Sequence, residues 1–384
     1  MADSSTILSL LGRLKSYPKI YSLLRRGWRF LDTMMIESLR KLGVGARFGG
    51  PRGFYSGLQE LRLGGMTGRV VVESQALPPL PVPSLIELAG MGQNGRQPWP
   101  IFWLEQRNTR LVGSSLAPLS NEKFLMLEAV YGEEFCRRDP SFNYLFLPRP
   151  VQLEGDWTSL VGTWSEGFYH WLTDALPRLA MLSEFPAETK ILIRGPLKQY
   201  QRESLSMLGL LDRIRETSEN HLLVEDYYFS SPAGMSGCTN PHVTGWLREK
   251  FLSHGAPLQT PSKFFVLRRG KTRGIRNQEE VAEFFRSFGW AVVDLEELSF
   301  ADQISWFANA EAVVAEHGAG LTNLVWCSLG TKVLELCSAN FINGCYEGIS
   351  LCLGLGHRFE VLPANRDGRM TVPLDRLLEL TQEF

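Results

Sequence analysis

The chain has 384 residues, of which 44% are hydrophobic and 21% are charged, and its formal net charge is -1. This composition is typical of a soluble globular protein that is long enough for two domains with ordinary cores. The near-neutral charge argues against nucleic acid as a general partner, because phosphate backbones favour a basic protein face. The six cysteines show neither a CxxC pair nor a zinc-type spacing, so we interpret them as free thiols in a reducing compartment.

The first 50 residues are basic, with nine Lys or Arg against three Asp or Glu, and apolar side chains recur there at helical spacing. We expect residues 1–55 to form a basic amphipathic helical extension. Such a segment can lie on an anionic membrane surface, or it can pack on the body of the protein. No run of roughly 20 apolar residues and no signal-peptide pattern occurs. We therefore expect a cytoplasmic protein, either free or peripheral at the inner face of the membrane.

Residues 56–255 are predicted to form a first α/β domain. Apolar or alternating runs predict strands at residues 70–72, 101–104, 124–127 and 144–147. From residue 158 onward strands alternate with helices. The strands are predicted at 160–161, 191–193 and 222–224, and the helices from Gly167, around Leu205 and over residues 242–252. The polar, proline-marked stretch 255–262 is the predicted linker.

Strands alternate with helices of about ten residues through residues 263–384, which we predict to be the C-terminal domain. The strands are apolar runs at residues 264–267, 291–293, 312–315 and 333–336. Such alternation indicates parallel βαβ units in a doubly wound sheet. Ligands of these sheets bind beyond the carboxyl ends of the strands. Arg268, His317 and Glu335 lie at or just past such ends.

Two helices of this half carry recognisable caps. Asn277 with Glu280 three residues later resembles a capping box, and Gly289 is well placed to end the helix that it opens. Ser299 followed by Asp302 predicts the start of the next helix.

The run HGAGLTN at residues 317–323 is the most distinctive motif of the chain. It follows an apolar strand and precedes an apolar segment, so the predicted order is strand, glycine loop and helix. Glycines let a backbone approach a ligand closely, and the first N–H groups of a helix are unpaired donors. The turn therefore suits a phosphate-bearing ligand. Glycine also occurs at such turns for purely steric reasons.

A second constellation lies in residues 166–178, where a helix would place His170 and Asp174 one turn apart on a single face. A histidine oriented by a carboxylate is a reasonable general base near neutral pH. The alternative is a His–Asp pair on a helix surface with structural value alone.

Two rival activities have weaker support. A serine hydrolase could use the His–Gly turn as an oxyanion hole, but the nearest G-x-S-x-G match, residues 234–238, has Cys238 at its last position. A dehydrogenase fingerprint requires glycine where Asn323 stands.

The segments FYHWLTDALPRL, FVLRRGKTRGIRN, HGAGLTN and TKVLEL resemble glycosyltransferase family 61 in order and spacing, over about residues 158–340. The resemblance implies an α/β, GT-B-like fold, with two Rossmann-like domains around a central cleft. Residues 56–255 would be the acceptor side and residues 263–384 the nucleotide-sugar side.

The resemblance also implies an inverting transfer of a hexose or pentose from a nucleotide sugar, expected to carry UDP, with no metal ion or other cofactor. Because bacterial members act in capsular polysaccharide biosynthesis, we expect a glycan or lipid-linked acceptor in cell-surface polysaccharide synthesis. The alternative is a non-catalytic nucleotide- or glycan-binding protein that retains the fold.

The residues can be assigned roles in such a reaction. No Asp-any-Asp triplet occurs, so cationic side chains and helix-end N–H groups would have to stabilise the departing diphosphate. His170, oriented by Asp174, is the expected base, with Asp174 itself and Glu316 as substitutes. Glu335 is expected to accept hydrogen bonds from ribose hydroxyls. The expected donor-binding residues are Arg268, Arg269, Arg273, His317, Gly318, Ala319, Gly320, Leu321, Thr322, Asn323 and Glu335.

Overall fold

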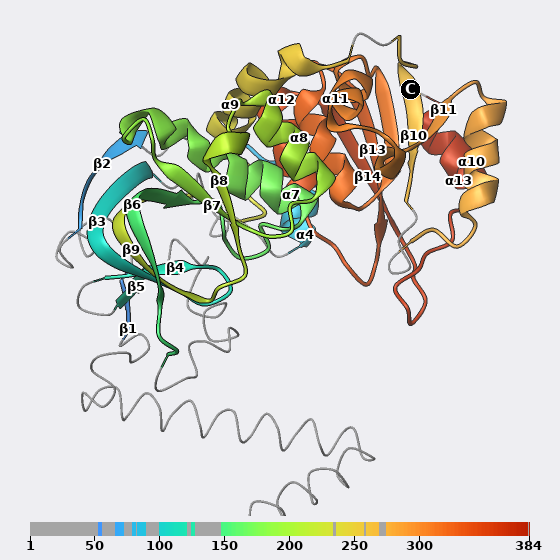
Figure 1. Cartoon of the computed structure of the whole chain (residues 1–384). Coiled ribbons are helices and arrows are strands. Elements are labelled where there is room, and N and C mark those ends of the chain that lie inside the picture. The colour runs from blue at the N-terminus through green and yellow to red at the C-terminus, as the bar shows by residue number, and fades with distance from the viewer. Residues whose placement is uncertain are drawn as a thin grey trace, which may run out of the picture. The chain divides into compact units, whose positions relative to one another are not determined.

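The computed structural model of the chain is an α/β structure with parallel strands, as predicted (Figure 1). It describes residues 53–55, 66–72, 79–81, 83–89, 100–120, 124–126, 147–232, 236–256, 259–268, 274–382 and 384. All but the last three residues of the predicted N-terminal extension, and all but the last residue of the predicted strand at 144–147, lie outside this description. Among the described residues no helix has the length and apolar character needed to cross a bilayer.

The chain divides into two compact units. The first comprises Met1–Met66, Asn108–Leu153 and Glu219–Glu225, and the second comprises Thr67–Arg107, Glu154–Ser218 and Asp226–Phe384. The predicted linker at residues 255–262 falls inside the second unit. The division of the sequence into residues 56–255 and 263–384, and the GT-B arrangement of two domains around a cleft, therefore stay predictions.

Short strands form the described part of the first unit. β1 (Gly53–Tyr55) pairs in parallel with β5 (Phe124–Met126), and β4 (Ala117–Leu119) pairs antiparallel with both β5 and the end of β3 (Ile101–Val112). The strands predicted at residues 101–104 and 124–127 are thereby confirmed, although β5 ends one residue earlier than predicted.

The N-terminal part of the second unit begins with β2 (Thr67–Val72), which pairs antiparallel with the start of β3. β6 (Val151–Ser159), β7 (Lys190–Arg194) and β8 (Ile214–Thr217) pair in parallel, and β9 (His221–Ser230) follows along the chain; the first residues of β6 and β9 belong to the first unit. The predicted strand at 160–161 is wrong, because β6 ends at Ser159. Leu160 nevertheless donates its N–H to the carbonyl of Leu192 at 3.0 Å, as an extension of the ladder would. The helices of this part are α4 (Leu85–Leu88), α8 (Gln199–Met207), η5 (Leu211–Arg213), α9 (Pro241–Phe251) and η6 (Leu252–His254).

The helix predicted from Gly167 is composite. It comprises α7 (Phe168–His170), the π-helical turn η3 (Trp171–Ala175) and the 3-10 helix η4 (Leu176–Glu184). Pro177 occupies the first turn of η4, where its missing N–H is tolerated. The π-helical turn therefore lies between His170, the predicted base, and Pro177. Single π-helical turns of this kind are frequent at functional sites.

A five-stranded parallel sheet forms the C-terminal part of the second unit, in the order β11-β10-β12-β13-β14. The strands are β10 (Lys263–Leu267), β11 (Ala291–Asp294), β12 (Ala312–Glu316), β13 (Lys332–Ser338) and β14 (Gly356–Leu362). The first four confirm the strands predicted for residues 263–336. The sequence analysis did not predict β14, where exposed and half-buried side chains outnumber buried ones.

Helices cover both faces of this sheet (Figure 1). α10 (Gln278–Ser287) and α13 (Leu374–Thr381) pack on one face, which includes Phe265, Val314 and Leu334. α11 (Phe300–Ala308), α12 (Cys345–Leu353) and the 3-10 helix η8 (Ala319–Trp326) pack on the other, and the short η7 (Leu295–Glu297) follows β11.

Of the two predicted caps, one is present. Ser299 and Asp302 form the capping box of α11, with each side chain bonded to the backbone N–H of the other residue. The predicted capping box at Asn277 is wrong, because the amide group of Asn277 bonds the backbone of Val372 at 2.9 and 3.0 Å instead. Gly289 ends its helix as predicted, with a φ of 77° that favours glycine.

Candidate functional site

The glycine turn lies at the carboxyl end of β12, the central strand of the parallel sheet. Residues 317–320 are exposed or half-buried, whereas residues 321–326 are buried. A Cβ atom at Gly318 would lie 3.3 Å from the Arg268 side chain, and one at Gly320 would lie 2.9 Å from Leu295. Close packing by neighbouring side chains therefore explains both glycines. The part of the turn that a ligand can reach is residues 317–320.

Residues 321–323 of the motif make contacts within the protein. Thr322 donates its hydroxyl to the carbonyl of Ala319 at 2.7 Å. The side chain of Asn323 donates to Gln303 and accepts from the indole N–H of Trp326, at 2.9 Å each. Leu321 belongs to the hydrophobic core. Donor contacts by Leu321, Thr322 and Asn323 stay predictions that this geometry does not favour.

Arg268 follows β10 and lies across the turn. Its Nη1 donates to the carbonyl of His317 at 3.1 Å, and its Nε lies 3.8 Å from Oε1 of Glu316. A quarter of its side chain is exposed, so the guanidinium can contact a ligand at the turn. Arg269 and Arg273, the other predicted cations, lie outside the described residues.

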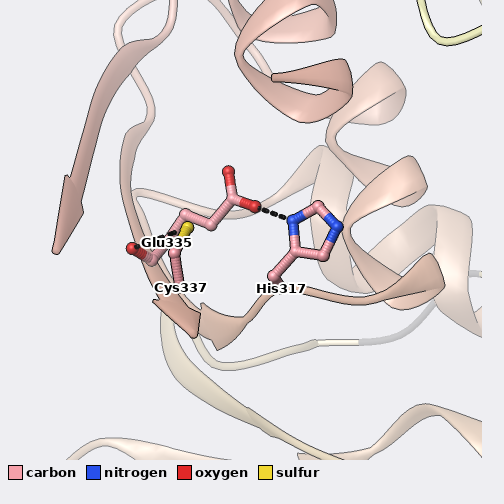
Figure 2. A group of neighbouring side chains, drawn as sticks. All are labelled: His317, Glu335 and Cys337. Atoms are coloured by element: carbon pink, nitrogen blue, oxygen red, sulfur yellow. Dashed lines mark hydrogen bonds and ion pairs between the residues drawn. The ribbon is translucent and has the colours of Figure 1, made fainter. Parts of the chain in front are cut away.

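A buried hydrogen-bonded chain holds His317, and Figure 2 shows its first link, between His317 and Glu335. Nδ1 of His317 donates to Oε1 of Glu335, and Nε2 of His357 donates to the second oxygen at 3.1 Å. Ser350 bonds the remaining ring nitrogen of His357 at 2.7 Å. This arrangement directs Nε2 of His317 away from Glu335 (Figure 2).

Glu335 is fully buried at 0% exposure. Burial by itself raises the pKa of its carboxyl, but the hydrogen bonds and charges of His317 and His357 outweigh burial, and the pKa is lowered overall. Both oxygens are occupied by imidazoles. A ribose contact by Glu335 stays a prediction that this geometry does not favour, because one imidazole would first have to leave.

Cys337 lies beside this pair, and the ligand atoms of His317, Glu335 and Cys337 are within 4.8 Å of one another (Figure 2). Imidazole, carboxylate and thiolate are all zinc ligands, but two ligands of one tetrahedral zinc lie roughly 3.4 Å apart. His317 and Glu335 are instead in direct hydrogen-bond contact. Burial also raises the pKa of the Cys337 thiol, which favours its neutral form. The geometry therefore fits a hydrogen-bonded cluster better than a metal site.

His170 and Asp174 lie one turn apart and are paired, as their spacing predicts. Nδ1 of His170 donates to Oδ2 of Asp174 at 2.8 Å. Asp174 is 8% exposed, and the hydroxyl of Thr173 lies 2.9 Å from its second oxygen. Trp164 and Tyr169 flank the imidazole with ring centroids at 5.2 Å each. The pair is thus held within a packed environment, and its catalytic role stays a prediction.

Ser236 is a member of this cluster that the sequence analysis considered only as a nucleophile. Its hydroxyl donates to Oδ2 of Asp174 at 2.7 Å and lies 3.0 Å from Nδ1 of His170. A serine nucleophile would have to bond the ring nitrogen opposite the carboxylate. Ser236 instead shares Nδ1 with Asp174, which argues against a hydrolase triad. No described residue hydrogen-bonds Nε2 of His170, which is left as the atom that can meet a substrate.

The two clusters are neighbours within the second unit, because α7 packs against η8. The rings of Tyr169 and Tyr346 are 5.8 Å apart, and that of Tyr346 is 5.0 Å from His317. Tyr169 also packs edge-on against His170. Burial raises the pKa of both tyrosines well above the ordinary value, so both stay neutral. A neutral aromatic wall therefore connects the predicted base to the glycine turn.

Comparison with known proteins agrees with the sequence motifs. Residues 168–334 match the model of the family described as Glycosyltransferase 61. The match starts at α7 and ends in β13, so it includes the His170–Asp174 pair and the glycine turn, whereas Glu335 and His357 lie beyond its end. A search of curated proteins finds no match. Over these residues, somewhat less than half of its length, the chain is thus similar to glycosyltransferase family 61.

Proposed function

We propose that the protein is a glycosyltransferase that moves a hexosyl or pentosyl group from a nucleotide sugar to a glycan or lipid-linked acceptor. The observation that carries the proposal is the contact between α7, with its His170–Asp174 pair, and η8, which follows the glycine turn. The family match spans both elements.

In the proposed donor site, the diphosphate lies on residues 317–320 at the carboxyl end of β12. The guanidinium of Arg268, the Nε2–H of a protonated His317 and the backbone N–H groups of residues 318–320 face it. Cations and preorganised N–H donors stabilise the negative charge that develops on a leaving diphosphate. These groups are the support for a reaction that does not need a metal ion.

In the proposed acceptor site, Nε2 of His170 accepts the proton of the attacking hydroxyl as that oxygen bonds to the anomeric carbon. The nucleoside diphosphate leaves from the opposite face, so the configuration is inverted. Asp174 keeps the Nδ1 proton of His170 in place and stabilises the imidazolium that forms. The hydroxyl of Ser236 donates to Oδ2 of the same carboxylate. The carboxylate of Asp174 is already engaged by His170 and Ser236, which favours His170 for the role of base.

The proposed setting is cell-surface polysaccharide synthesis of the bacterial capsular type, at the inner face of the membrane and with a UDP-linked donor. Its support is the sequence: the motifs resemble that family, and the first 50 residues are rich in Lys and Arg. A basic segment of this kind favours an anionic surface.

A thermal-shift screen against nucleoside diphosphates and their sugar conjugates tests donor binding, because a ligand of the native state stabilises it by mass action. His170→Ala then tests the base. We expect transfer to fall by about 10²- to 10⁴-fold, the usual contribution of general base catalysis, with donor binding unchanged. His254→Ala, which alters an exposed histidine, is the matched control.

The outcomes separate the alternatives. Retained transfer by His170→Ala would remove His170 from the mechanism, and joint loss of binding and transfer would assign it a structural role. A donor that stabilises the protein but is never transferred or hydrolysed would favour a non-catalytic binding protein.

A further inference from the structure

Glu316, the last residue of β12, is a buried carboxylate that the proposed reaction does not use. It is 4% exposed. Alternate side chains of a strand point to opposite faces. Val313 and Ala315 pack on the α11 and α12 face, and Val314 packs on the α10 face. Glu316 therefore points to the α10 face, away from the aromatic wall that leads to His170. This orientation does not favour Glu316 as a substitute base.

The hydrogen bonding of Glu316 is incomplete. Oε2 accepts the backbone N–H of Ile275 at 2.8 Å, whereas Oε1 is buried and has no hydrogen-bond partner among the residues that the structure describes. Among the described residues the cation within ion-pair distance is Arg268, whose Nε lies 3.8 Å from Oε1. An unpaired buried carboxylate oxygen is costly, so the ionised form of Glu316 depends on its cationic neighbours.

Two charged groups among the described residues attract this carboxylate. They are Arg268, which follows β10, and Arg369, which precedes α13 and reaches the carbonyl of Ile275 at 3.5 Å. His317 is next in sequence, but its ring turns to Glu335 on the other face. Burial raises the pKa of Glu316 to about 7, although Arg268, the Ile275 N–H and Arg369 each lower it. Both protonation states are therefore populated near neutral pH.

We propose that Glu316 takes up a proton when the diphosphate of the nucleotide sugar binds, because ionised Glu316 competes with that diphosphate for Arg268. The inference rests on the proposed function, in which Arg268 contacts the donor. The step is a simple exchange: one proton moves from solvent to Glu316, and the guanidinium exchanges its carboxylate neighbour for a phosphate oxygen. No covalent bond forms or breaks.

The direction of the effect follows from the charges. A bound diphosphate adds negative charge near Glu316 and engages Arg268, so the pKa of Glu316 is higher in the complex than in the free protein. Below the free pKa, Glu316 is already protonated and affinity does not change with pH. Above it, binding requires a proton and affinity falls as pH rises. One pH unit above the free pKa, the loss is about tenfold.

Glu316→Gln imitates the protonated state, and its amide oxygen can still accept the N–H of Ile275. We expect the variant to match the unmodified protein at about pH 6 and to bind the donor about tenfold more tightly at about pH 8. Glu347→Gln is the matched control. Glu347 is equally buried, but a single oxygen of its carboxylate accepts from both Ser84 and Ile86.

The probe is whichever of UDP-glucose, GDP-mannose and ADP-glucose stabilises the full chain most. These nucleotide sugars are diphosphate diesters, so they lack a terminal phosphate group. A terminal phosphate takes up a proton at about pH 6, and that proton would be counted together with the one on Glu316. Calorimetry in two buffers of different ionisation enthalpy measures proton uptake directly. We expect uptake that approaches one proton at about pH 8 in the unmodified protein and none in Glu316→Gln.

Each outcome decides the matter. Binding without proton uptake in the unmodified protein would overturn the inference, even if Glu316→Gln failed to fold. Equal uptake by Glu316→Gln would assign the proton to another group and would also overturn it. Absence of binding by all three probes would instead count against the proposed function.

Discussion

The buried chain His317–Glu335–His357 makes Glu335 a sensitive carboxylate for a stability test. Its two oxygens serve two different imidazoles. Glu335→Gln keeps the shape but offers one acceptor and one donor. The least costly arrangement leaves the amide oxygen on His317 and turns the amide N–H to Nε2 of His357, whose other nitrogen can donate to Ser350.

The expected loss in the free energy of unfolding follows from this exchange of hydrogen bonds. A hydrogen bond to a charged group contributes about 1.5–3 kcal/mol. Glu335→Gln weakens both bonds by removing the charge and reverses one of them, so we expect a loss of about 2–3 kcal/mol in the free energy of unfolding. Glu347→Gln should cost much less, because both of its partners bond the same oxygen, which the amide oxygen can replace.

Urea unfolding followed by tryptophan fluorescence measures this loss, because Trp171 and Trp326 are buried in the same unit. The pKa of Glu335 is lowered in the folded protein. Its stabilisation is therefore complete above the unfolded pKa of about 4.3 and is lost as pH falls through the folded pKa. The difference between the unmodified protein and Glu335→Gln should persist from neutral pH to about pH 5.

A loss below about 0.5 kcal/mol at neutral pH would refute the reasoning, because surface substitutions reach that size without any special mechanism. A loss as large in Glu347→Gln would show that burial alone, rather than the double imidazole contact, sets the cost.

Three further predictions concern the contact between Gly344 and Ile86, the donor site and the need for a metal ion. Gly344→Ala should lower the free energy of unfolding by about 1–3 kcal/mol, because its Cβ would lie 2.4 to 2.7 Å from atoms of Ile86. Calorimetry measures the melting temperature, and an unchanged melting temperature would contradict this prediction. Arg268→Ala should weaken nucleotide-sugar affinity about tenfold or more by equilibrium titration, with exposed Arg276→Ala as the control; unchanged affinity would exclude Arg268 from the site. Transfer activity should survive an excess of chelator in a product assay, whereas strict dependence on a divalent ion would count against the metal-independent proposal.

Local patterns were sufficient for most elements of the parallel sheet. Continuous apolar runs identified β10 and β12 because their side chains are buried on both faces. The one-turn spacing of His170 and Asp174 identified their pairing, because residues four apart share a helix face. β14 escaped prediction because half-buried and exposed side chains interrupt its apolar pattern.

Hydrogen bonds between residues far apart in the chain could not be predicted from local sequence patterns. Ser236 is 62 residues from Asp174, yet the two are hydrogen-bonded. The Asn277 cap failed because Val372, 95 residues away, competes for its amide. In each case the sequence offers a polar group with several partners of suitable chemistry, and only the packing of elements selects one.

By itself the sequence determined most strands of the parallel sheet, the capping box at Ser299, the glycine turn and the likeness to glycosyltransferase family 61, because these depend on short-range spacing. The tertiary structure decided which side chains remain available to a ligand. In that structure Glu335 is hydrogen-bonded between two histidines, and Glu316 points to the α10 face of the sheet. Ser236 is hydrogen-bonded to Asp174 of the His170–Asp174 pair. The physical reason is that availability depends on burial and hydrogen-bond competition between segments distant in the chain, and no local pattern records that competition.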